Sequence, residues 1–148
     1  MADDDEMNVP GVIDKLGTAL TLQHRSVVQL TLAAGGTTGL AHQALAEQFA
    51  LWADAELRDA RLLVEKLCGL GGVPPTEVAP VRWAAEAEAM SDIVIESETE
   101  VVAALHAVIP DTGQEPRSEA LEHLMEHIIL RKQHQIDALV RARGITEG

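Results

Sequence analysis

Aromatic residues are scarce in this sequence: of 148 residues, one is Phe, two are Trp and none is Tyr. The strands of β-sandwiches are enriched in aromatic and β-branched residues, whereas the abundant Ala and Leu of this chain favour helices. Cysteine is equally scarce, because Cys68 stands alone, and we expect its thiol to be packed rather than redox-active. The sequence has neither a signal peptide nor a long uncharged apolar run, which indicates a cytoplasmic protein without disulfides.

Positive charge is also in short supply. The chain has 11 Lys and Arg against 24 Asp and Glu, which gives a formal net charge of −13. A charge of this size repels phosphate backbones and anionic lipid surfaces. We therefore expect no nucleic-acid or membrane binding as a main activity, and a small or cationic soluble partner is favoured.

Hydrophobic residues make up 47% of the chain, which is ample for the core of one domain of this length. The acidic start, MADDDEM, is expected to be disordered. The sequence therefore predicts a disordered segment at 1–8 and one helical domain at 9–144. Glycine and proline divide that domain into four long segments, the first of which is predicted to run from Asn8 or Pro10 to Ala34, before two glycines.

Similar signals delimit the other three helices. The second is predicted over residues 37–68, where the segment GLGGVPP then stops it, and the third over residues 83–110. Thr112-x-x-Glu115 has the form of a capping box, with Pro116 in the first turn or Ser118 as a later cap, and predicts the start of a fourth helix that reaches about Gly144. The pattern predicts an all-α antiparallel four-helix bundle with a long crossover between the second and third helices.

Each of the four helices carries a polar residue in the middle of its hydrophobic face, taken at 100° per residue. These residues are Gln23 in the first helix, Glu56 and Asp59 in the second, Glu98 in the third, and Lys132 and Gln135 in the fourth. In the first helix the face is predicted to consist of Leu16, Leu20, Val27 and Ala34 around Gln23. A buried polar residue needs a partner, so we expect the six side chains to meet in one polar core.

This arrangement resembles that of the ferritin-like di-iron carboxylate proteins, and of bacterioferritin in particular. Such bundles project one Glu from each of two helices and a Glu-x-x-His motif from each of the other two into their core. The segments AELRDARLLVEKLCGLGGVPP, IVIESETEVVAALHAVI and HQIDAL carry the resemblance, which spans residues 10–143. By position, Glu56 and Glu98 match metal-ligating glutamates of the family. The resemblance implies a ferritin-like bundle and a role connected with iron.

Four positions depart from the ligand set of the family. Gln23 stands in place of Glu, Asp59 in place of His, Lys132 in place of Glu and Gln135 in place of His. A shift of one residue would bring Arg131 and His134 to the last two positions. That alternative is no better for a cation, and it places both side chains off the hydrophobic face.

Two hypotheses about this substituted site stay open. In the first, the ammonium group of Lys132 lies where a metal would have been, since it can satisfy the buried carboxylates. The protein is then a binding or regulatory module without ferroxidase activity or resident cofactor, with a possible protein partner in iron metabolism. In the second, Lys132 is neutral or turned aside, and Glu56, Asp59 and Glu98 hold a weakly bound iron or other divalent metal, with residual ferroxidase activity.

A second metal motif competes with this interpretation. His123-Leu-Met-Glu126-His127 matches the H-x-x-E-H signature of one group of zinc peptidases. These residues lie opposite the hydrophobic face of the fourth helix, and only a short segment follows them for the further acidic ligand. We interpret His123, His127 and His134 as a solvated or subunit-facing stripe, at which adventitious zinc or nickel binding is possible.

Two further expectations concern haem and assembly. Haem is not expected, because Leu57 stands where the resemblance to bacterioferritin would require a Met. The apolar residues expected to stay exposed on the first and second helices include Leu22, Leu30 and Leu51. An exposed apolar surface of this kind predicts an isologous homodimer.

Overall fold

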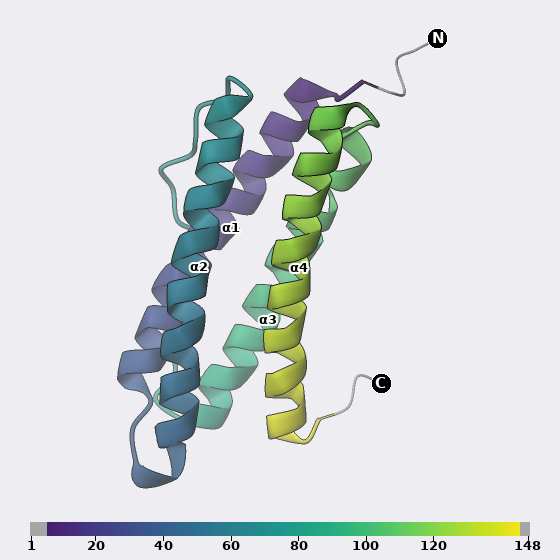
Figure 1. The fold of residues 1–148 in the computed structure, drawn as a ribbon. Coiled ribbons are helices and arrows are strands. Elements are labelled where there is room, and N and C mark those ends of the chain that lie inside the picture. The colour runs from purple at the N-terminus through teal and green to yellow at the C-terminus, as the bar shows by residue number, and fades with distance from the viewer. Residues whose placement is uncertain (1–5, 146–148) are drawn as a thin grey trace.

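The computed structural model describes residues 6–145, which form four long helices and no strand (Figure 1). The helices are α1 (Val9–Gly36), α2 (Gln43–Gly69), α3 (Ala87–His106) and α4 (Pro116–Arg143), with short 3₁₀ turns η2 (Leu40–His42) and η3 (Ile109–Asp111). The predicted all-α four-helix bundle is confirmed. Within the described residues, no helix is both long and apolar enough to cross a bilayer.

The chain direction explains the long connection between α2 and α3. In Figure 1, α1 and α4 run down the bundle while α2 and α3 run up it, so the segment 70–86 has to return along its length. That segment is fastened to α1, because the backbone N–H of Ala79 donates to the carbonyl of Thr21 at 3.1 Å. The backbone N–H of Arg82 likewise donates to Oε1 of Gln29 at 3.0 Å. The predicted crossover is therefore confirmed.

The start of α1 lies where the sequence predicts it. The side chain of Asn8 accepts a hydrogen bond from the backbone N–H of Gly11 at 3.2 Å, which caps the helix. The backbone N–H of Asn8 donates to the carbonyl of Asp111 at 2.9 Å, and the side chain of Met7 is only 7% exposed. Residues 6–8 thus pack on the bundle, although they were expected to be disordered. The rest of that expected segment, residues 1–5, lies outside the described residues.

The predicted capping box at the start of α4 is wrong. The hydroxyl of Thr112 donates to the carbonyl of Ile109 at 2.9 Å, which leaves it turned towards η3. Glu115 takes the N-cap position without a side-chain hydrogen bond, and Pro116 begins the helix. A proline needs no hydrogen-bond acceptor at that position, so the helix starts without the cap. At the other end, Gly144 adopts φ 66°, the left-handed conformation that glycine tolerates best.

The other two helices begin later than predicted. α2 starts at residue 43 because Gly39, at φ 99°, turns the chain into η2 first. α3 starts at residue 87, directly after its N-cap residue Glu86, whose backbone is extended. Cys68 is exposed, contrary to the expectation that its thiol is packed.

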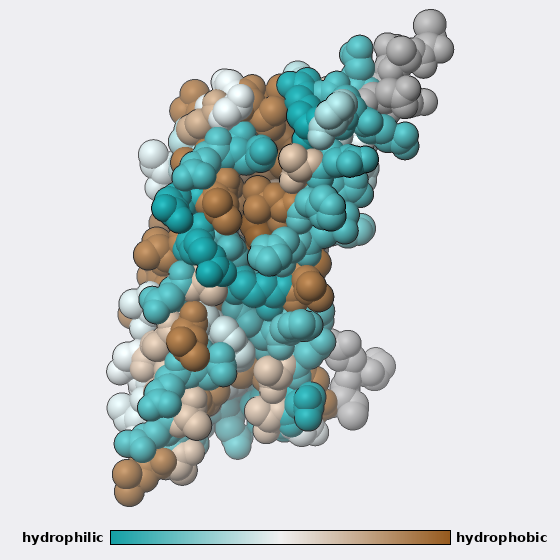
Figure 2. All heavy atoms as spheres, viewed as in Figure 1, coloured by the Kyte–Doolittle hydropathy of each residue, from teal (hydrophilic) through white to brown (hydrophobic). Residues whose placement is uncertain are grey.

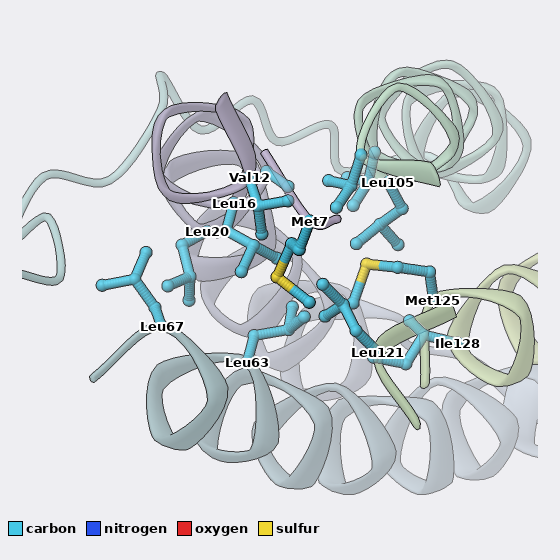
Figure 3. Packing of buried hydrophobic residues seen from close by; sticks show 13 residues of the cluster. Met7, Val12, Leu16, Leu20, Leu63, Leu67, Leu105, Leu121, Met125 and Ile128 are labelled. Atoms are coloured by element: carbon cyan, nitrogen blue, oxygen red, sulfur yellow. The ribbon is translucent and has the colours of Figure 1, made fainter. Parts of the chain in front are cut away.

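The hydrophobic core consists of two clusters, one at each end of the bundle. The upper cluster joins Met7 and the first half of α1 to the ends of α2 and α3 and the start of α4 (Figure 3). Its fully buried members include Leu16, Leu63 and Leu121. The lower cluster includes Leu30 and Phe49. Buried polar residues of all four helices, among them Gln23, Glu56 and Lys132, lie between the two clusters.

The buried face of α1 departs from the prediction in its second half. Val27 and Ala34 are only half-buried, whereas Leu30 and Ala33 are 1% and 0% exposed. After Leu20, the prediction placed the buried residues of this face at intervals of seven, at Val27 and Ala34. A straight helix drifts by about 20° over seven residues, so the buried face moves to other positions.

That drift also changes the surface expected to form a dimer. Leu30 is buried in the lower cluster and cannot contribute to an exposed surface. Leu22 is half-buried against the upper cluster, and only Leu51, at 64%, is well exposed. Dimerisation through α1 and α2 stays a prediction, with Leu30 removed from its surface.

Candidate functional site

The six inward polar residues predicted from the sequence all lie in the layer between the two hydrophobic clusters. Their relative exposures are Gln23 0%, Glu56 0%, Asp59 0%, Glu98 1%, Lys132 0% and Gln135 2%. Every helix of the bundle contributes at least one of them. Five of the six, all except Gln135, are joined by hydrogen bonds and ion pairs into a single cluster, which we call the core charge cluster together with Ser26 and Arg131.

Lys132 lies at the centre of the core charge cluster. Its Nζ donates to both carboxylate oxygens of Glu56 and to Oε2 of Glu98, each at 2.9 Å. The same nitrogen is 3.4 Å from Oγ of Ser26. An ammonium group has three protons to donate, so these acceptors account for its whole capacity. Lys132 thus links α4 to α2 and α3 through charge-assisted hydrogen bonds.

Arg131 is a second cation of the core charge cluster, and the sequence interpretation missed it. Its guanidinium group donates to Oε1 of Glu56, and its Nε donates to Oδ2 of Asp59 at 2.6 Å. The side chain is 16% exposed, so it enters the cluster from the edge. Its Cα lies off the hydrophobic face, but a long arginine side chain can reach inwards from there. The signal available in the sequence was charge: Asp59 had no cationic partner on the hydrophobic faces.

Glu56 joins the two cations. Its carboxylate pairs with Lys132 and with Arg131, and each cation also pairs with one further carboxylate, Glu98 or Asp59. The amide of Gln23 donates to Oε1 of Glu56 at 3.1 Å and to its backbone carbonyl at 2.9 Å. One shared carboxylate therefore lies between two positive charges, with one further carboxylate on either side.

A hydrogen-bonded set from α1 and α3 supports Glu98. The hydroxyl of Ser26 donates to Oε2 of Glu98 at 2.9 Å. In the neighbouring turns, Nε2 of Gln29 donates to the hydroxyl of Ser97 at 2.6 Å, and Nη2 of Arg25 donates to the backbone carbonyl of Ser97 at 3.3 Å. Nothing in the sequence pattern points to these residues as buried, because Ser, Gln and Arg are mostly found on protein surfaces.

The two glutamates titrate in opposite directions. Burial by itself would raise the pKa of Glu56, but the positive charges of Lys132 and Arg131 lower it to about 2. Burial and the negative charge of Glu56 raise the pKa of Glu98 to about 8, despite the neighbouring Lys132. At neutral pH, Glu98 is therefore mainly a neutral acid, whereas Glu56 keeps the negative charge that lies between Lys132 and Arg131.

The raised pKa of Glu98 predicts that the free energy of unfolding falls as the pH rises from about 5 to about 8. The folded state holds a proton that the unfolded state, with a pKa of 4.5, has already released, so rising pH favours unfolding across this window. Glu56 acts in the opposite sense only below its ordinary pKa of 4.5. Each unit of pKa shift corresponds to about 1.4 kcal/mol, so the change amounts to a few kcal/mol.

Urea denaturation at several pH values measures this effect. Glu98→Gln keeps the shape and an acceptor oxygen for Lys132 and Ser26 but cannot titrate, so it should flatten the decline. Glu96→Gln is the matched control on α3, because Glu96 is largely exposed and its ion pair with Arg82 lies at the surface. A decline that is equally steep in Glu98→Gln would contradict the assignment to Glu98.

Several buried polar atoms in and beside the core charge cluster form no hydrogen bond among the residues that the structure describes. Within residues 6–145, no hydrogen bond reaches Oε1 of Glu98, Oδ1 of Asp59 or either amide atom of Gln135. Gln135 is thus buried, as predicted, but is not joined to the cluster by a hydrogen bond. Such atoms cost free energy unless something polar satisfies them.

The donor set does not fit a di-iron centre. The resemblance implies four carboxylates and two imidazoles, whereas the layer offers Glu56, Asp59 and Glu98 and no His. The Nζ of Lys132 lies between the first and last of these, where a second cation would be repelled. Among the residues that the structure describes, no group of three or more His, Cys, Asp or Glu is arranged to hold a metal ion.

The residues of the H-x-x-E-H motif, all of which the structure describes, are likewise not arranged as a group of three or more metal ligands. His123, Glu126, His127 and His134 are all exposed, as expected for a solvated stripe. Binding of zinc or nickel to a pair of these imidazoles stays a prediction.

Comparisons with known proteins agree with this fold. Residues 13–142 match the family model described as a ferritin-like domain. The solved structure of a ferritin-like, diiron-carboxylate protein from Bacillus anthracis str. Ames is similar to this chain, with a TM-score of 0.84 and 22% sequence identity. The match covers 97% of this chain and 99% of that one. The search of curated proteins found no match. Because the family model covers most of its length, this chain belongs to the ferritin-like family.

Proposed function

We propose that this protein is a ferritin-like binding or regulatory module that has lost ferroxidase chemistry. The observation that supports the proposal best is the position of Lys132, whose Nζ is 2.9 Å from carboxylate oxygens of both Glu56 and Glu98. These are the glutamates that match metal ligands of the family. A protein of this kind needs no resident cofactor and acts through its surface.

The second cation extends this reasoning. Lys132 bridges Glu56 and Glu98, while Arg131 bridges Glu56 and Asp59. Two side-chain cations that share one carboxylate supply positive charge that metal ions would otherwise bring. Each contributes a single unit, which suits the three acidic side chains of this layer. The cations are covalently part of α4, so the balance of charge does not depend on metal supply. A fold stabilised in this way keeps one surface whether or not iron is present.

One set of atoms favours the competing function, a ferritin-like protein that binds iron or another divalent metal weakly. Oε1 of Glu98 and Oδ1 of Asp59 are carboxylate oxygens without a hydrogen bond among the described residues. A single hard cation would use such oxygens. It would, however, have to displace or deprotonate Lys132 first, which the short contacts of its ammonium group oppose.

Aerobic oxidation of ferrous iron separates the two functions. We expect the full-length protein, without an affinity tag, to oxidise added Fe²⁺ no faster than buffer, because Lys132 and Arg131 repel it from the carboxylates. The absorbance of ferric products follows the rate, and metal analysis after gel filtration measures what the protein retains.

The variant His123→Ala with His127→Ala serves as the control, since it removes two of the three exposed imidazoles of the stripe and leaves the core unchanged. Metal retained by the natural protein but not by this variant belongs to the surface stripe. Rapid oxidation in both proteins, with iron retained by both, would instead establish the weak core metal site and overturn the proposed loss of ferroxidase chemistry.

A further inference from the structure

A groove of about 800 Å³ runs along the exposed side of α3 and α4. The end of α3, η3 and residues 122–133 of α4 line it. Its hydrophobic part consists of Ile109, Ile129 and Leu130. The first two pack against the upper core cluster, and the side chain of Leu130 is 57% exposed. The groove is thus an extension of the hydrophobic core that is open to solvent, which is typical of an interaction site when polar residues border it.

The border of the groove is acidic. Glu122 and Glu126 line it one turn apart on α4, and Glu119 continues the row in an adjoining hollow. His106, His123 and His127 are its other ionisable residues, and among the described residues that line it there is no Lys or Arg. The whole chain carries a net charge of −13, which adds a long-range attraction for positive partners. Charge complementarity therefore calls for a cationic occupant.

We propose that this groove docks an amphipathic helix of a partner protein, with aliphatic anchors on one face and Lys or Arg beside them. Residues 122–133 rise by about 16 Å, or three helical turns, which is long enough for anchors at i, i+4 and i+7 of a docked helix, because these span about 10 Å. The proposal rests on the proposed function as a binding module, for which it supplies the surface and the chemistry of the partner. A second copy of this chain is a poorer occupant, because it brings its own negative charge to an acidic groove.

Fluorescence anisotropy with a labelled synthetic peptide tests the proposal on the full-length protein in EDTA. The probe is an amphipathic helix with Leu on one face and Lys on the other, and a peptide of the same composition in scrambled order is the companion. We expect only the amphipathic peptide to bind saturably. Leu130→Ser should weaken its binding about tenfold, since a central aliphatic anchor is lost. Leu57→Ser, on α2 and 61% exposed, should leave it unchanged.

A charge-matched pair tests the acidic border. Glu122→Lys with Glu126→Lys should weaken binding and reduce its dependence on salt. Glu47→Lys with Asp54→Lys makes the same change in net charge on exposed positions of α2 and should have little effect.

Equal losses in the groove and α2 variants, or equal binding of the scrambled peptide, would reduce the effect to net charge and overturn the proposal. Peptide binding that occurs in a parallel titration without EDTA, but not in EDTA, would assign the groove to a metal ion and again overturn the proposal. If Leu130→Ser changed the oligomeric state seen by sedimentation but not the affinity for the peptide, the groove would be an interface between two copies of this chain, and the proposal would be overturned. None of these outcomes affects the iron-oxidation result, so a failure of the docking proposal is distinguishable from a failure of the proposed function.

Discussion

Replacing Lys132 by Met is expected to lower the free energy of unfolding by about 3–5 kcal/mol at pH 8, because it leaves buried carboxylates without their partner. The loss should be smaller at about pH 5. Without the ammonium group the pKa of Glu56 rises, so the folded variant takes up a proton as the pH falls, and this relieves the penalty. Urea denaturation at the two pH values measures the difference.

Two companion variants make this result specific. Lys15→Met removes a half-exposed lysine that pairs with Asp111 at 2.7 Å, and it should cost no more than about 1 kcal/mol at either pH. Lys132→Met combined with Glu56→Gln removes one charge of each sign and should recover much of the stability, even if the single variant does not fold. If Lys132→Met were as mild as Lys15→Met, the ammonium group could not be the centre of the core charge cluster.

Restoring the ligands of the family should make the fold depend on metal. The variant combines Gln23→Glu, Asp59→His, Lys132→Glu and Gln135→His with Arg131→Ala. Its metal-free form should be less stable than the natural protein, because acidic side chains then meet without a cation. Fe²⁺ under anaerobic conditions, or Zn²⁺, should raise its melting temperature, since a ligand at about 100 times its Kd adds about 2.7 kcal/mol.

The control for this experiment is a variant that keeps Arg131. In a chain that carries the four ligand substitutions but keeps Arg131, the guanidinium group can still pair with Glu56, so metal should stabilise that chain less. The natural protein should gain little from either metal. A five-substitution variant that metal fails to stabilise would show that the layer is not the counterpart of a di-iron site, and the positional match of Glu56 and Glu98 would then be wrong.

Arg131 also illustrates how far a helical wheel can be trusted. Its Cα lies outside the hydrophobic face of α4, so periodicity alone assigns it to solvent, as it does His134. His134 is indeed exposed. The guanidinium group of Arg131 reaches Glu56 and Asp59 because its side chain is long enough to bend back into the layer. Periodicity places the backbone of a residue, whereas the reach of a long side chain depends on what lies opposite.

The sequence by itself determined the class of fold and the six residues that fill its polar layer. Gln23, Glu56 and Lys132 interrupt hydrophobic faces, and a buried polar group needs a partner wherever its helix packs. Glycine and proline positions set the number of helices, and the parallel course of α2 and α3 follows from the long crossover.

Only the tertiary structure decided how those residues pair. Which carboxylate takes which cation depends on the rotation and crossing of four helices, and no periodicity encodes these. The drift of the α1 face placed Ser26 beside Glu98 and moved Leu30 into the core. The opposite titration of Glu56 and Glu98 has the same origin, because it depends on distances of a few ångströms between α2, α3 and α4. Electrostatic interactions in a buried layer vary steeply over such distances, so they are settled only when the helices pack.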